Sequence, residues 1–155
     1  MTEPRVTLRE ITDDNRDAVT ALSAGPAEGR FVASVAKSFK DAEETPEGHP
    51  WYRAIYAGDV PVGFLMLSWD VTPAPGILGP WFLWRLLIDE RYQRHGYGRD
   101  ALRVVIELIR AAGATELLTS YVPGDGGPWP FYEKLGFRPT GEIEEDEIVI
   151  RLPIA

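Results

Sequence analysis

The chain has 155 residues, 45% of them hydrophobic, which suits one sizeable core, so we expect a single domain spanning residues 1–155. A formal net charge of −8 argues against a nucleic-acid partner. The absence of cysteine and the presence of only two histidines argue against disulfides and a metal site. No apolar run reaches the ~18 residues of a membrane span, so we expect a cytoplasmic protein without membrane contact.

The first half of the chain carries strand and helix patterns in turn. Residues 6–11 alternate as a strand does, and residues 12–23 begin with acids suited to capping a short amphipathic helix. Residues 51–70 predict two strands joined by a tight turn at Gly58-Asp59. Between these segments, residues 30–44 predict a second helix, whose apolar stripe would be Val32, Val35, Ala36 and Phe39.

The second half predicts a strand, a helix and a second strand that lies parallel to the first. Residues 81–89 form a nearly continuous apolar run, which is typical of a central strand, and residues 115–122 form the later strand. A crossover of this kind is right-handed and places the two strands side by side in parallel. The helix between them ends at Gly113, and its apolar face consists of Leu102, Val105, Ile106 and Ile109.

The chain ends with a short helix and two strands. Residues 128–137 predict a helix with prolines in its first turn and Gly136 at its end. Phe131 and Leu135 are spaced to face the core, so Tyr132 should point elsewhere. Residues 138–154 predict an antiparallel hairpin.

Two closely spaced glycines, Gly96 and Gly98, precede the long helix. Glycine permits positive φ and close approach to the backbone, and free N–H groups at a helix start bind anions. The same letters fit a dinucleotide fingerprint, with Glu116 as its ribose-binding acid. That interpretation fails because Asp89 to His95 separate the strand from the glycines and only 57 residues follow Gly98.

Two motifs carry a resemblance to a known family. The hexapeptide Gln93-Arg94-His95-Gly96-Tyr97-Gly98 resembles the Q/R-x-x-G-x-G/A signature of the GNAT superfamily, which contains acetyl-CoA-dependent N-acyltransferases, and FYEKLGF at 131–137 resembles its second hallmark. The resemblance implies a mixed α/β fold with a central mixed, mostly antiparallel sheet, a splayed parallel strand pair and helices on both faces. A closer similarity, through FVASVAKSF, RAIYAGDVPVGFLML, LWRLLID and LLTSYVPG, is to bacterial spermine/spermidine acetyltransferases.

The resemblance implies acetyl-CoA as co-substrate and assigns a role to two segments. In the family the pyrophosphate lies against the glycine loop, and backbone groups of the preceding strand hold the pantetheine. The strand residues here would be Leu87, Ile88 and Asp89. The loop residues would be Arg94, His95, Gly96, Tyr97, Gly98 and Arg99. Asp125 stands where the family commonly has an asparagine that contacts the coenzyme.

The catalytic groups follow less directly from the resemblance. Tyr132 matches the tyrosine that protonates the departing thiolate in the family, with a packed aromatic as the alternative role. Arg85 stands where several members place a carboxylate base, and it stays charged at any working pH. A base would therefore come from Glu28, Glu43, Glu44, His49 or water.

We expect the acceptor to be a small amine, with a polyamine as the first candidate. Carboxylates and aromatic faces bind such cations, which makes Glu28, Glu43, Glu44 and Trp84 candidate substrate residues. The acidic run GEIEEDE at 141–147 is more simply explained as a solvated hairpin turn. Since no base is evident, an acyl-CoA-binding sensor module is the alternative function. The protein could also form a homodimer.

Overall fold

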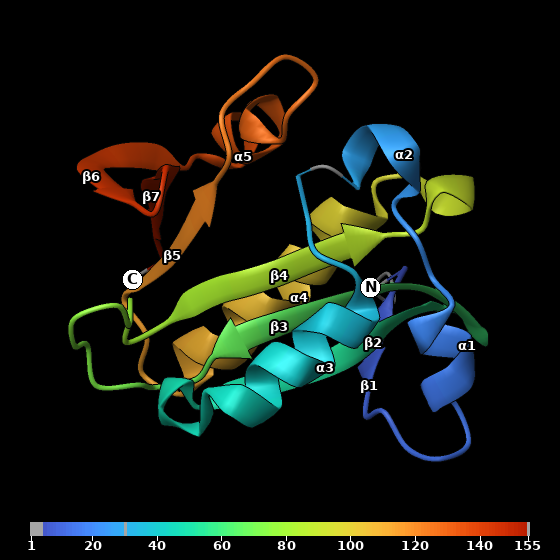
Figure 1. Cartoon of the computed structure of the whole chain (residues 1–155). Coiled ribbons are helices and arrows are strands. Elements are labelled where there is room, and N and C mark those ends of the chain that lie inside the picture. The colour runs from blue at the N-terminus through green and yellow to red at the C-terminus, as the bar shows by residue number, and fades with distance from the viewer. Residues whose placement is uncertain (1–4, 30, 155) are drawn as a thin grey trace.

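The computed structural model describes residues 5–29 and 31–154, apart from the side chain of Glu28, and is built on one mixed β-sheet (Figure 1). Within these residues the sheet has seven strands in the order β1-β2-β3-β4-β5-β7-β6. The strands are β1 (Thr7–Arg9), β2 (Pro50–Ala57), β3 (Val60–Ser68), β4 (Phe82–Ile88), β5 (Glu116–Tyr121), β6 (Arg138–Glu144) and β7 (Glu147–Pro153). Only β4 and β5 pair in parallel, which confirms the expected mixed, mostly antiparallel sheet.

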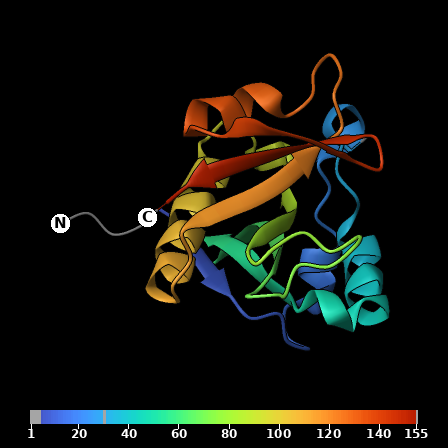
Figure 2. The ribbon, with the colours of Figure 1, turned by 90° about the vertical axis from the view of Figure 1, so that its left-hand side faces the viewer.

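Helices cover both faces of the sheet, as expected (Figures 1 and 2). They are α1 (Arg16–Thr20), α2 (Gly25–Glu28), α3 (Val35–Glu44), α4 (Tyr97–Ala111) and α5 (Trp129–Leu135), with 3-10 turns η1 (Pro46–Gly48) and η2 (Glu90–Tyr92). The order of elements follows the prediction, with the short α2 added. Within the described residues no helix is long and apolar enough to cross a membrane.

Two apolar clusters lie on opposite faces of the sheet because successive strand residues point to opposite sides. Along β3, Leu65 and Leu67 pack with α4, whereas Phe64 and Met66 pack with α1 and α3. All four side chains are buried. The alternating side chains of β3 therefore pack against helices on both faces of the sheet.

A serine cap sets the start of α3, and a glycine follows the end of α4. The Ser34 side chain accepts a hydrogen bond from the Lys37 N–H at 3.1 Å, so α3 begins at Val35 rather than near residue 30. As a result Val32 lies before the helix and Ala36 is exposed, which corrects the expected stripe. At the end of α4, Gly113 has φ 103°, the left-handed conformation expected of a stop.

The parallel strands β4 and β5 separate almost at once. Their register comprises only Phe82 with Leu118 and Leu83 with Thr119, after which the strands diverge (Figure 1). At this fork the Thr119 hydroxyl donates to the Leu83 carbonyl at 2.8 Å. The splayed pair that the family resemblance implied is therefore present, and it opens the sheet in its middle.

The helix α5 presents a different face to the core than the sequence suggested. Tyr132 is buried, and its ring packs edge-on against Phe131 and Phe137, at centroid distances of 5.1 and 5.3 Å. Phe131 and Leu135 are only half-buried. The expectation for Tyr132 was wrong because Phe131 and Leu135 lie at the margin of the core, where Phe131 also borders a cavity at the open fork, and Tyr132 fills the interior between them and the sheet.

Candidate active site

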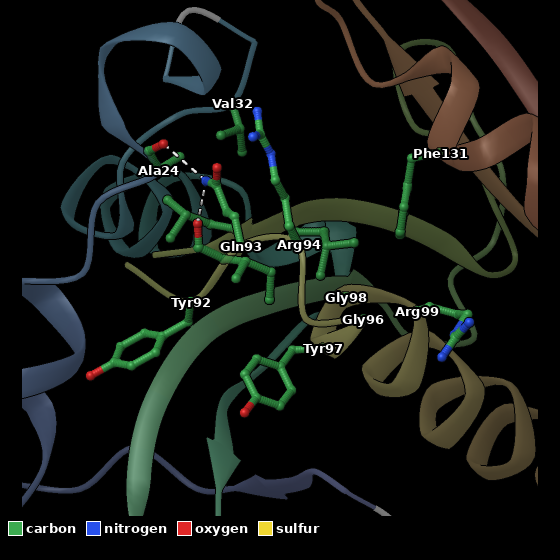
Figure 3. Close-up of a pocket in the computed structure, with 13 residues that line it drawn as sticks. Ala24, Val32, Tyr92, Gln93, Arg94, Gly96, Tyr97, Gly98, Arg99 and Phe131 are labelled. Carbon is green, nitrogen blue, oxygen red and sulfur yellow. Dashed lines mark hydrogen bonds between the residues drawn. The ribbon is translucent and has the colours of Figure 1, made fainter. Parts of the chain in front are cut away.

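A cavity of about 280 Å³ lies at the start of α4, beside the open half of β4. We call it the helix-start cavity; it is lined by Ala24, Val32, Leu86, Leu87, Ile88, Tyr92, Gln93, Arg94, Gly96, Tyr97, Gly98, Arg99 and Phe131. Figure 3 shows Ala24 and Val32 on one side of it and Phe131 on the other, with the glycine loop between them. Five of the six predicted loop residues thus share one wall.

The glycine loop is held open by its own backbone and by one amide side chain. Arg94 and Gly96 have φ of 68° and 81°, so the chain turns sharply before Tyr97 begins the helix. Gln93 Nε2 donates to the carbonyls of Ala24 and Ile88, each at 2.9 Å (Figure 3). These bonds tie the loop to both neighbouring segments.

The first turn of α4 offers unpaired donors to this cavity. The first intrahelical bond runs from the Asp100 N–H to the Gly96 carbonyl at 3.0 Å. The N–H groups of Tyr97, Gly98 and Arg99 therefore have no backbone acceptor within the described residues, as at any helix start. With the positive end of the helix dipole, they make this cavity wall suitable for a phosphate group.

The glycine at position 98 allows a neighbouring ring to come close. A Cβ placed there would lie 3.4 Å from the Phe131 ring and 3.7 Å from the Ile88 side chain. Any branched side chain would extend from this point into the space between β4 and α5. A Cβ alone would make ordinary contacts at these distances, whereas a larger side chain at residue 98 would take up space in the cavity.

The open edge of β4 includes Ile88, as the sequence suggested, but the other two residues expected there face β3. The Asp89 N–H donates to Val62 O at 2.9 Å, and its carbonyl accepts from the Tyr92 N–H at 2.9 Å. Because backbone groups alternate along a strand, Leu87 also faces β3, whereas Leu86 and Ile88 face the fork. The backbone groups that face the fork are therefore the N–H and C=O of Leu86 and the N–H of Ile88, and not those of Leu87 and Asp89.

Asp89 serves as a local anchor rather than a cavity residue. Its buried carboxylate accepts from the Ser23 N–H at 3.0 Å and from the Arg91 Nε at 2.8 Å. Burial raises the pKa of this carboxyl, but these bonds outweigh it and hold the pKa below its usual range. His95 also lies outside the cavity lining, with an exposed ring stacked on Tyr97 at 5.6 Å.

A second cavity, of about 360 Å³, adjoins the other half of β4. We call it the hairpin cavity; it is lined by Asp41, Thr45, Gly48, Ser68, Gly76, Ile77, Leu78, Phe82, Trp84, Arg85, Ser120, Glu144, Glu145 and Glu147. The two cavities therefore border consecutive segments of one strand, with Arg85 in the second and Leu86 in the first. A donor in one and an acceptor in the other would meet beside these residues.

A β-bulge at Trp84 sets which side chains reach the hairpin cavity. Met66 pairs with Arg85 but Leu67 pairs with Leu83, so Trp84 is the extra residue. The bulge turns Arg85 toward α3, where it forms an ion pair with Asp41 at 2.6 Å. Burial lowers the pKa of the Arg85 guanidinium, and the carboxylates of Asp41 and Glu147 oppose that shift.

Carboxylates dominate the hairpin cavity, and most of them were not the expected ones. Glu144, Glu145 and Glu147 come from the β6–β7 hairpin, whose acidic run was assigned to solvent. Asp41 comes from α3 and was missed; its edge position on the helix gave no signal that separates it from Glu43. With Arg85 as the single cation among the lining residues, the cavity is strongly negative.

The other substrate and base candidates lie elsewhere. Glu43 and Glu44 are exposed and line neither cavity, and Glu44 faces Lys40 at 3.9 Å. His49 is exposed, with its Nδ1 3.3 Å from the Trp69 carbonyl. Glu28 ends α2, but its side chain lies outside the described residues. Of the four candidate substrate residues, the hairpin cavity brings in Trp84.

Tyr132 lies at the fork, in contact with the parallel strands. Burial raises the pKa of its phenol to about 12, a shift that a hydrogen bond with the Thr119 side chain partly opposes. Thr119 itself belongs to the last paired step of β4 and β5. The phenol is therefore protonated at any working pH and sits where the two strands part.

Comparison with known proteins identifies the family to which the chain belongs. The Acetyltransferase (GNAT) family model matches residues 9–137, so the chain belongs to this family. It is 27% identical over 147 residues to the Bacillus subtilis (strain 168) spermine/spermidine N(1)-acetyltransferase, covering 90% of this chain and 91% of that protein. It is 25% identical over 131 residues to the Escherichia coli (strain K12) [ribosomal protein bS18]-alanine N-acetyltransferase, covering 73% and 87%.

A solved structure has a similar fold. The PaiA N-acetyltransferase from Thermoplasma acidophilum, in complex with coenzyme A, superposes with a TM-score of 0.67 at 14% identity, over 96% of this chain and 98% of that one. The protein is thus a GNAT N-acetyltransferase that uses acetyl-CoA. No group of three or more His, Asp or Glu suited to a metal ion occurs among the described residues.

Proposed function

We propose that the protein acetylates a primary amine of a small polycation, with spermine or spermidine as the first candidates. The observation that carries this proposal is the hairpin cavity, which four carboxylates and one arginine line. Their negative field would attract a cationic acceptor and hold its distal ammonium groups. Trp84 adds an aromatic face to the same wall, which suits a cation further.

The turn of the β6–β7 hairpin supports this role for Glu145. Glu145 and Asp146 have φ of 48° and 68°, the left-handed conformation that Asn-Gly would adopt at lower energy. Each such residue costs on the order of 1 kcal/mol. A strained acidic turn at the cavity mouth is consistent with selection for ligand contact over stability.

The donor would occupy the helix-start cavity. We assign its pyrophosphate to the N–H groups of Tyr97, Gly98 and Arg99, and its pantetheine to the open backbone groups of Leu86 and Ile88. The thioester would then lie at the fork, between the two cavities. Arg94 lines the same cavity and adds positive charge.

In this arrangement Tyr132 is the proposed general acid. The neutral amine attacks the thioester carbon, the C–S bond of the tetrahedral intermediate breaks, and the Tyr132 hydroxyl gives its proton to the departing sulfur. The proton that the acylated nitrogen loses passes to water, and water restores the phenol. Since the described candidates for a base lie outside both cavities, we assign the proton of the acceptor ammonium to water. A cytoplasmic location, a homodimer and a single domain stay predictions.

A panel of amines tests the acceptor. We expect spermidine to be acetylated with a lower KM than a peptide with an N-terminal alanine or an aminoglycoside. Glu145→Gln should raise the KM for spermidine about fivefold at low salt, less so at high salt, and leave cofactor affinity unchanged. Glu44→Gln is the matched control, because it removes the same charge outside the cavity. Turnover of the peptide but not of spermidine would remove the polyamine assignment.

A further inference from the structure

The Arg5 side chain, at the start of the described residues, contacts the start of α4. Arg5, just before β1, donates a hydrogen bond from its guanidinium to the His95 carbonyl. Its Nε lies 2.9 Å from Asp100 Oδ2, and its guanidinium lies over the Tyr97 ring, 5.1 Å from the centroid. A Cβ on Gly96 would lie 3.6 Å from Arg5, so the side chain borders the glycine loop itself.

The partner of Arg5 is an acid in an unfavourable place for a phosphate site. Asp100 lies in the first turn of α4, and its side chain is only 13% exposed. Its carboxylate competes for the same positive helix end that a bound pyrophosphate would use, and its burial limits screening by water. Arg99 is the other cation near it, with Nε 3.6 Å from the second carboxylate oxygen.

We infer that Arg5 is a positioning residue for the cofactor, which neutralises Asp100 and so lets the pyrophosphate of acetyl-CoA approach the first turn of α4. This inference rests on the proposed phosphate site. Arg5 does not need to touch the phosphate, because its donors already bond to His95 and face Asp100. The helix dipole favours an acid in this turn, and with Arg5 beside it the pair carries no net charge toward the phosphate.

A double-mutant cycle on coenzyme A binding tests the inference. By calorimetry at low salt, Arg5→Ala should raise the Kd for coenzyme A about tenfold, because Asp100 then keeps only Arg99, at 3.6 Å, as a cationic neighbour. Asp100→Asn should leave the Kd equal or lower, and the double variant should return to within about twofold of the wild type. Arg5→Lys, which keeps the charge, should stay within about threefold, and the effect of Arg5→Ala should shrink at high salt.

Arg9→Ala is the matched control for the loss of a nearby cation, four residues further along the chain in β1. The Arg9 guanidinium contacts Asp59 at 3.2 Å, the Gly58 carbonyl and the Tyr56 ring, away from the start of α4, so its loss should not change the Kd. An unchanged Kd in Arg5→Ala would overturn the inference, and so would a double variant that binds as weakly as Arg5→Ala. The phosphate site itself fails separately, if Gly98→Val binds coenzyme A normally.

Discussion

Replacing Tyr132 by phenylalanine isolates the proposed acid, because the change removes one hydroxyl and keeps the ring. The ring packs against Phe131 and Phe137, and both contacts survive the change. The hydrogen bond with Thr119 is lost, which should lower the free energy of unfolding by about 1 kcal/mol. We therefore expect a folded variant with unchanged affinity for coenzyme A.

The size of the kinetic effect follows from the environment of the phenol. With a pKa of about 12, Tyr132 is a weaker acid than a thiol of pKa ~8.5, so full proton transfer costs about 5 kcal/mol in isolation. The proton should therefore be only partly transferred in the transition state. We expect kcat to fall by about 10²-fold, at the low end of the range for a lost general acid.

Steady-state kinetics with two donors measure this effect. The loss should be large with acetyl-CoA and smaller with a donor whose thiol leaves without a proton. Tyr121→Phe is the matched control, because Tyr121 is likewise a buried tyrosine that lines neither cavity, but its ring stacks on Trp129 at 5.5 Å, whereas the Tyr132 hydroxyl bonds with Thr119 at the fork. Equal kcat for wild type and Tyr132→Phe with acetyl-CoA would refute the role and leave Tyr132 as a packing residue.

Two further predictions concern the cavity wall and the buried phenol. Gly98→Val should raise the Kd for coenzyme A at least about tenfold, because the added side chain lies beside Phe131 and extends into the helix-start cavity. Gly98→Ala should have an intermediate effect. Normal binding by a folded Gly98→Val would contradict the proposed site. Because the folded-state pKa of Tyr132 exceeds the unfolded value near 10, its stabilisation is complete below pH 10 and is lost toward pH 12. Between pH 9 and 11, wild type should lose about 1.3 kcal/mol of unfolding free energy relative to Tyr132→Phe in denaturant titrations, and equal losses would refute the buried titration.

The sequence predicted the elements well because most of them carry a clear period and an end signal. The hairpin at Gly58-Asp59 and the stop at Gly113 were confirmed. The face of α5 was not predicted, because seven residues hold too few turns for a stripe to be unique. The pairing of Asp41 with Arg85 joins residues 44 positions apart, and no local pattern encodes such a contact.

The bulge at Trp84 decides which way the side chains in the middle of β4 point. Without the extra residue, Arg85 would point to the same face as Leu83, into the apolar cluster packed on α4. A charge buried there without a partner would be strongly destabilising. The bulge instead turns Arg85 toward Asp41 and Glu147, and beyond it Leu86 and Ile88 face the open fork. One inserted residue thus makes an arginine tolerable in mid-strand and separates the wall of the proposed donor cavity from that of the proposed acceptor cavity.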